Sequence, residues 1–171
     1  MAAIVGSFAL TLFLSCVCFA QPGGLDDIAP PPVQVIHKDD LEKLDAEADV
    51  KQKTQLSMTL MNTRLTDAEG FFNKTDYENM FLALGQFHGL MTYELAFLSK
   101  ADNSKGKPLD NFKKFELALK GYQVRLELMH REMPLRWEEY IRKLIKYVRD
   151  GRAKALEPMF SDTVVPVKTD Q

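Results

Sequence analysis

A helix that is apolar on nearly every side constrains the fold of this chain more than any other feature. Residues 75–100 place large apolar side chains at helical spacing along one stripe, and a second apolar set covers much of the remaining surface. Thr75, followed three residues later by Glu78, predicts the helix start as a capping box. The main stripe consists of Tyr77, Met80, Leu84, Phe87, Met91, Leu95 and Leu98. Such a helix must be covered by neighbouring helices, so the sequence predicts an all-α fold.

Three further helices are predicted around this central one. The first begins at Asp39 and ends at Gly70 or Asn73, because either residue tolerates the left-handed conformation that ends many helices. The third begins near Pro108 and carries an apolar heptad seam. The seam consists of Phe112, Phe115, Leu119, Tyr122, Leu126, Met129 and Met133. The fourth helix is expected over residues 135–156.

Pro134 decides how these helices are connected. A kinked but continuous helix would leave the apolar stripe of residues 137–155 uncovered, at about 1.5–3 kcal/mol for each large side chain. A tight reversal instead lets short links join antiparallel neighbours, so we expect an up-down-up-down four-helix bundle over residues 39–157. The alternative is a long helix kinked at Pro134, with intermolecular coiled-coil packing and a homodimer.

Charged residues form two blocks of opposite sign. Residues 39–50 carry six acids and one base, whereas residues 142–154 carry six bases and one acid. In an up-down-up-down bundle, the start of the first helix and the end of the fourth lie at the same end. We therefore expect the two blocks to face and neutralise one another.

The first twenty residues have the pattern of a secretory leader. Residues 2–20 contain no charge, and Cys18 and Ala20 place small side chains three and one positions before Gln21. We expect cleavage between Ala20 and Gln21 and a secreted or periplasmic protein. The alternatives are a lipoprotein headed by Cys16 and an uncleaved anchor, because this apolar run is near the lower length limit for spanning a bilayer.

The remaining chain is predicted to be one domain with extended ends. Residues 21–38 include a triple proline and are interpreted as an extended linker, and residues 158–171 as an extended tail. Both cysteines, Cys16 and Cys18, belong to the predicted leader. Cleavage would leave no disulfide, no thiolate nucleophile, no Cys-ligated zinc and no membrane span. The near balance of charge gives no general attraction to nucleic acid, so none is expected as a partner.

One fragment of a metal-binding pattern occurs. Glu127 and His130 form a Glu-x-x-His pair, which carboxylate di-metal bundles use twice, together with inward-facing glutamates from other helices. Here the pair occurs once, and the seam places Glu127 outward. Glu94 on the central helix is the additional carboxylate that could complete a site. Because the set is incomplete, no metal or other cofactor is predicted, and these residues support only an alternative hypothesis.

The central helix also carries His88, Gly85 and Gly89. His88 lies at the edge of the apolar stripe and is predicted to be a core residue with satisfied hydrogen bonds. Gly85 and Gly89 share one face, which predicts the close approach of a neighbouring helix. Methionines at seam positions favour core filling, with a groove for an apolar ligand as the alternative. They are Met58, Met61, Met80, Met91, Met129 and Met133.

The fourth helix supplies the predicted contact surface. Arg142, Lys146 and Arg149 form a basic strip that would bind an envelope protein or an anionic surface, unless neighbouring acids neutralise it. No nucleophile set, repeated metal motif or phosphate loop is present. The sequence therefore predicts an exported, non-catalytic interaction or structural module. The alternatives are a bundle that binds a metal or an apolar ligand, and an enzyme.

Overall fold

The computed structural model describes residues 34–102 and 109–160, and within these ranges the chain forms five α-helices and no strand. The helices are α1 (Lys38–Ala46), α2 (Val50–Phe72), α3 (Tyr77–Asp102), α4 (Leu109–Glu132) and α5 (Leu135–Phe160). The predicted all-α class is confirmed. None of the helices in the described ranges is long and apolar enough to cross a membrane. The predicted leader, most of the linker and the tail from residue 161 lie outside the described residues.

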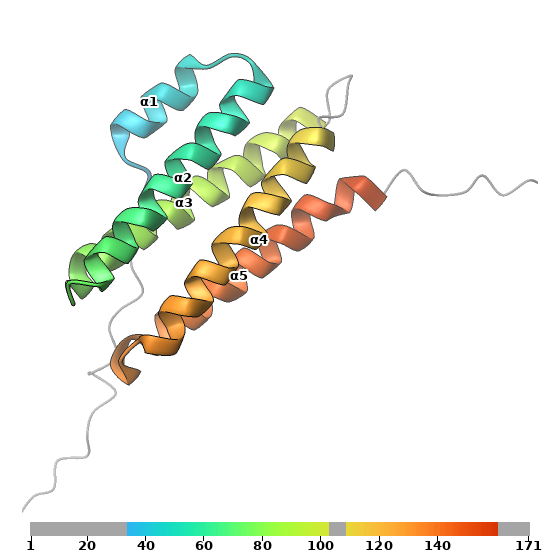
Figure 1. Ribbon diagram of the computed structural model, residues 1–171. Helices are drawn as coiled ribbons and strands as arrows, with labels where there is room; N and C mark the ends of the chain where they lie inside the picture. The colour runs from blue at the N-terminus through green and yellow to red at the C-terminus, as the bar shows by residue number, and fades with distance from the viewer. Residues whose placement is uncertain (1–33, 103–108, 161–171) are drawn as a thin grey trace, which may run out of the picture.

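The helices pair into two antiparallel hairpins, α2 with α3 and α4 with α5 (Figure 1). Their turns, at residues 73–76 and 133–134, lie at the same end of the molecule (Figure 1). α2 also packs on α4, and α3 on α5. The predicted heptad seam of α4 faces this shared core, where Phe115, Leu119 and Leu126 are fully buried. The two hairpins therefore cover the apolar stripes of one another.

The chain reverses at Pro134 and does not continue as one kinked helix. The Met133 backbone N–H donates to the His130 carbonyl at 3.3 Å and closes the last turn of α4. The Pro134 carbonyl then accepts from the Trp137 N–H at 2.8 Å and opens α5. α5 continues through Pro158, beyond its predicted end. A proline in the last turn removes only one hydrogen bond, which explains why the helix tolerates it.

The predicted first helix is in fact two helices, because the chain is extended between them at Glu47 and Asp49. The Asp49 carboxylate accepts the backbone N–H of Gln52 at 2.8 Å and caps α2. The Glu47 carboxylate accepts the N–H of Asp49, also at 2.8 Å. Such local bonds between side chain and backbone compete with helix continuation, and apolar periodicity does not reveal them.

The predicted capping box at the start of α3 is displaced by one residue. Thr75 has a positive φ of 58° and lies in the turn, so it cannot act as the cap. Asp76 takes that role, since its carboxylate accepts the backbone N–H of Asn79 at 3.2 Å. Asn73 follows the end of α2 as predicted, but in the right-handed conformation. The left-handed residue of this turn is Thr75.

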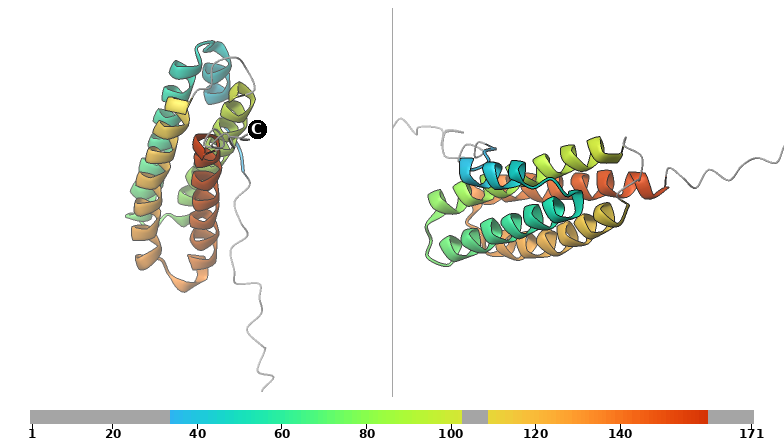
Figure 2. Two further views of the ribbon diagram at one scale, coloured as in Figure 1. Left: turned by 90° about the vertical axis from the view of Figure 1, so that its right-hand side faces the viewer. Right: turned by 90° about the horizontal axis from the view of Figure 1, so that it is seen from above.

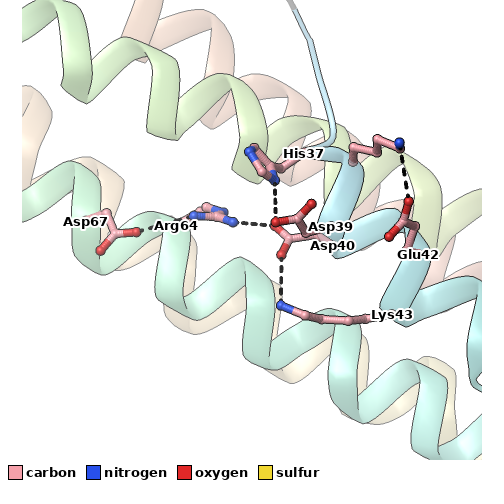
Figure 3. Close-up of polar contacts among 8 residues, drawn as sticks. His37, Asp39, Asp40, Glu42, Lys43, Arg64 and Asp67 are labelled. Carbon is pink, nitrogen blue, oxygen red and sulfur yellow. Dashed lines mark hydrogen bonds and ion pairs between the residues drawn. The ribbon is translucent and has the colours of Figure 1, made fainter.

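The short helix α1 folds back onto the α2–α3 hairpin (Figure 2). Asp40 is almost completely buried and forms an ion pair with Arg64 of α2, while Lys43 approaches its other oxygen at 3.9 Å (Figure 3). On α3, the Tyr93 hydroxyl donates to the Asp45 carboxylate at 3.2 Å. These contacts fix α1 on both helices of the hairpin.

The predicted pairing between the acidic and basic blocks is wrong. The acids of α1 contact α2 and α3, whereas the bases of α5 pair within their own hairpin. Arg149 meets Glu127 at 3.0 Å, and Arg152 meets Glu116 at 2.7 Å, both on α4. No ion pair joins the two blocks in the described part of the chain. The break before α2 is the physical reason, because it directs the acidic helix back along its own hairpin.

Candidate binding groove between α3 and α5

A groove of about 860 Å³ lies between the C-terminal halves of α3 and α5, away from the two hairpin turns (Figure 1). Its base is apolar and is formed by Met91 and Leu95 of α3, Phe112 of α4 and Gly151 of α5. Met91 and Phe112 are almost fully buried, so they fix the base by packing in the core. A concave site of this size, with an apolar base, suits a small or elongated ligand.

Gly151 keeps the base of the groove open. A Cβ atom at this position would lie 3.4 Å from Leu95 Cδ1 and 3.5 Å from Met91 Sδ, which is ordinary contact distance. A methyl group would therefore fit without strain. A larger side chain would have to enter the groove or displace its base, so the absence of a side chain here helps to define the cavity.

His88 and Tyr147 form part of the wall where α3 and α5 meet. Their rings stack with centroids 4.8 Å apart and an interplanar angle of 19°. Burial lowers the pKa of His88, so its ring is uncharged at neutral pH. The prediction that His88 is a core residue is wrong. It is only half-buried because α5 covers one face of its ring while the groove borders it.

The rim of the groove is polar and carries both signs of charge. Asp150, Lys154 and Glu157 of α5 lie on one side, and Thr92 of α3 lies on the other. Asp150 forms an ion pair with Lys146 at 2.7 Å. Lys154 makes no ion pair with any residue that the structure describes. The rim therefore offers hydrogen-bonding groups, and its charges of opposite sign largely cancel.

The segment before α1 lies beside this groove. The Gln34 amide donates to the His88 carbonyl at 3.3 Å and contacts the Thr92 hydroxyl. A Cβ atom added to Gly89 would lie only 2.7 Å from the Val35 carbonyl oxygen. The close approach predicted at the α3 glycines therefore exists at Gly89. However, the segment that approaches Gly89 is the extended segment before α1, whereas a neighbouring helix was predicted.

The structure does not bring the three metal candidates together. Glu127 of α4 binds Gln123 at 2.8 Å and Arg149 at 3.0 Å, and these contacts lower its pKa. His130 lies near the α4–α5 turn, with Nε2 3.4 Å from the Glu138 carboxylate. Glu94 lies in the C-terminal half of α3, roughly 25 Å along the helix axis from the start of that helix beside the hairpin turns, at 1.5 Å per residue. Within residues 34–102 and 109–160, no three acids, histidines or cysteines are grouped as a metal site would require.

Glu94 is instead a carboxyl group buried between α3 and α2. Its side chain has no exposed surface, and neither oxygen has a hydrogen-bond partner. Burial raises its pKa, while the nearby hydroxyls of Thr54 and Ser57 and the charge of Lys53 act in the opposite direction. The Ser57 hydroxyl is also without a hydrogen-bond partner. Glu94, Thr54 and Ser57 thus form a small polar cluster in the α2–α3 interface, and among the described residues Glu94 belongs to no group of three acids, histidines or cysteines.

Each cation of the predicted basic strip lies beside an acid. Arg142 contacts Glu139, and Lys146 contacts Asp150 on the same helix. Arg149 contacts Glu127 across the hairpin. The strip is exposed, but its charge is largely compensated within α4 and α5.

Sequence reasoning did not locate the groove, although it considered one lined by methionines. Met91 does line it, whereas the other candidate methionines are buried in the core: Met58, Met61, Met80, Met129 and Met133. The available signals were Tyr147 and Gly151 on the inner side of α5. They remained ambiguous because the sequence does not show where two packed helices diverge.

Comparison of this chain with protein-family models, with curated proteins and with solved structures finds no significant match.

Proposed function

We propose that this protein is an exported, non-catalytic binding module that holds an elongated ligand with an apolar face in the α3–α5 groove. In this proposal, α2 to α5 constitute the predicted up-down-up-down four-helix bundle, and residues 1–20 are the cleaved leader. One observation carries the proposal: an open groove with an apolar base, formed by Met91, Leu95 and Phe112.

The chemistry of the groove supports binding through apolar contact more than through charge. His88 is uncharged at neutral pH, and Tyr147 stacks on it. The rim charges of Lys154 and Glu157 have opposite signs. Each 100 Å² of apolar surface removed from water contributes about 2.5 kcal/mol before the costs of association. The ligand is therefore expected to present an apolar face to the base and polar groups to the rim.

The basic strip has less support as the contact surface. Arg142, Lys146 and Arg149 each have an acidic neighbour, and exposed ion pairs of this kind contribute little binding energy. Binding there would require an anion to replace acids that are already in place. The groove needs no such replacement.

The test is to block the groove without disturbing the core. Ala96 is an exposed residue of α3 that lines the groove, so Ala96→Trp places an indole in the cavity. Ala153→Trp is the matched control, because Ala153 is exposed on α5 and does not line the groove. The probe is Nile red, a neutral dye whose emission shifts to the blue in apolar surroundings.

The unmodified protein is expected to bind Nile red saturably, Ala96→Trp to bind it at least tenfold more weakly, and Ala153→Trp to bind it normally. Equal binding by all three proteins, or no binding by the unmodified protein, would refute the groove as the site. Circular dichroism checks that each variant retains its helices. Charge reversal at Arg142, Lys146 and Arg149 together is expected to leave dye binding unchanged.

A further inference from the structure

α4 has apolar residues on two opposite faces. One face is the buried heptad seam, and the other consists of Leu117, Gly121, Val124 and Leu128, which we call the outer seam. The side chains of Leu117, Val124 and Leu128 remain 54–55% exposed. A Cβ atom at Gly121 would meet no atom within 4 Å, so the space above this glycine is open. Isolated exposed leucines are common in proteins, but an aligned row on one helix face is a candidate interface.

The spacing of the outer seam is that of a helix–helix interface. Its residues are separated by four, three and four positions, which is the heptad pattern by which two helices pack side by side. α2 and α5 cover the flanks of α4. The outer seam points away from both, since Arg125 faces α2 and Glu116 faces α5.

We propose that the outer seam joins two copies of this chain through an antiparallel pair of α4 helices. In this arrangement, Val124 of each copy packs over Gly121 of the other, and Leu117 packs against Leu128 of the other. The outer seam is therefore complementary to itself, because the open space above Gly121 is filled by the Val124 side chain of the other copy. A parallel pair would place Gly121 against Gly121 and leave a void at the centre.

The charges beside the outer seam also favour the antiparallel pair. A parallel pair would bring Lys120 beside Arg125 of the second copy, and Glu127 beside Glu132, so both pairs would repel. An antiparallel pair brings Lys113 beside Glu127 of the second copy at two symmetric places. Like charges also meet in the antiparallel pair: Lys120 with Lys120 and Arg125 with Arg125 near the dyad, and Lys114 with Arg131 at each end of the seam. The parallel pair has more such contacts and no attractive one, so the antiparallel pair is the less repulsive of the two.

The same pattern limits the strength of the contact. Lys114 and Arg131 occupy the next seam positions at either end, so the apolar seam is only four layers long. Stable interfaces bury about 800 Å² on each partner, which a seam of this length reaches only with its polar flanks. Association is therefore expected to be weak and to depend on protein concentration. The outer seam contributes no residue to the α3–α5 groove, so this proposal does not depend on the proposed function.

Sedimentation velocity of the full chain over a series of concentrations tests the contact. The unmodified protein is expected to shift from the mass of one chain toward that of two as concentration rises. Val124→Glu should lose this shift, because it places two carboxylates at the centre of the seam. Leu82→Glu is the matched control, since Leu82 is equally exposed but lies on α3, and it should retain the shift. An unmodified protein that stays monomeric, or equal association by both variants, overturns the proposal.

Disulfide trapping tests the orientation. In a Cys16→Ser, Cys18→Ser background, a mixture of Leu117→Cys and Leu128→Cys chains is expected to form a mixed disulfide dimer. Leu117→Cys alone should form none, since an antiparallel pair separates the two copies of residue 117 by about 16 Å along the axis at 1.5 Å per residue. Trapping by Leu117→Cys alone would overturn the antiparallel arrangement.

Discussion

Arg125 of α4 and Glu69 of α2 form a two-point ion pair that joins the two hairpins. Arg125 Nε lies 2.7 Å from one carboxylate oxygen of Glu69, and Nη2 lies 2.6 Å from the other. The same guanidinium donates to Asn62 at 2.8 Å and to Thr66 at 2.9 Å. The hydrogen bonds to Glu69 raise the pKa of Arg125, so its guanidinium remains protonated. Planar pairs of this kind fix the orientation of helices as well as their distance.

Arg125→Met is expected to lower the free energy of unfolding by about 1–2 kcal/mol, because it retains an apolar side chain but leaves Glu69 without its partner. Urea denaturation followed by circular dichroism measures the loss. Arg131→Met is the control, since Arg131 is exposed on the same helix and makes no ion pair in the described part of the structure. Equal stability of the two variants would show that the pair does not hold the hairpins together.

Asp40→Asn is expected to detach α1 without unfolding the hairpins. Asp40 is buried against Arg64, and removing its charge should cost about 1–3 kcal/mol of local stability. Hydrogen exchange of the amides of residues 38–46 measures this loss and should accelerate at least about fivefold. Asp39→Asn changes an exposed acid of the same turn and should leave exchange unchanged. Equal exchange in both variants would contradict the role of Asp40.

Gly89→Ala is expected to displace the segment before α1, because the new methyl group would collide with the Val35 carbonyl. The alanine also favours the helix by about 1 kcal/mol, so global stability should change little. The sensitive measurement is exchange of the Ile36 amide and the α1 amides, which should accelerate. Gly70→Ala has open space around its Cβ and should stabilise the protein slightly. Unchanged exchange in Gly89→Ala would show that the contact with Val35 is not tight.

Glu94→Gln is expected to stabilise the protein at neutral pH. Burial raises the folded-state pKa of Glu94 above its ordinary value of 4.5. Between these two pKa values the folded state binds more protons than the unfolded state, so stability falls as pH rises through this window. Above it the protein bears the full cost of the buried charge, which glutamine removes.

The expected gain in Glu94→Gln is about 1 kcal/mol or more near pH 7, and it should disappear near pH 4. Urea denaturation at both pH values measures it. Glu78→Gln, an exposed acid on the same helix, should show no such gain. A variant less stable than the unmodified protein at neutral pH would mean that the carboxylate is well solvated or paired.

The sequence by itself determined most of the helices. The apolar stripes of α3 and α4 predicted long helices, because periodicity acts within a few residues. Pro134 by itself allowed either a kink or a turn, and the reversal was predicted from the need to cover the apolar stripe that follows it. The break at residues 47–49 escaped prediction, since Asp49 and Glu47 cap the backbone through local bonds that interrupt no apolar stripe. The cap at Asp76 was missed for a related reason: three neighbouring polar residues all suit a helix start, and backbone conformation chooses among them.

Only the tertiary structure decided which surfaces are covered. Val124 belongs to an outer seam because α2 and α5 occupy the other sides of α4, and Tyr147 borders a groove because α3 and α5 leave space between them there. Glu94 is buried for the same kind of reason, since α2 closes over it. Periodicity shows where a helix is apolar or charged. The neighbour that covers each face depends on packing between segments far apart in the chain, and that packing decided both the groove and the exposed face of α4.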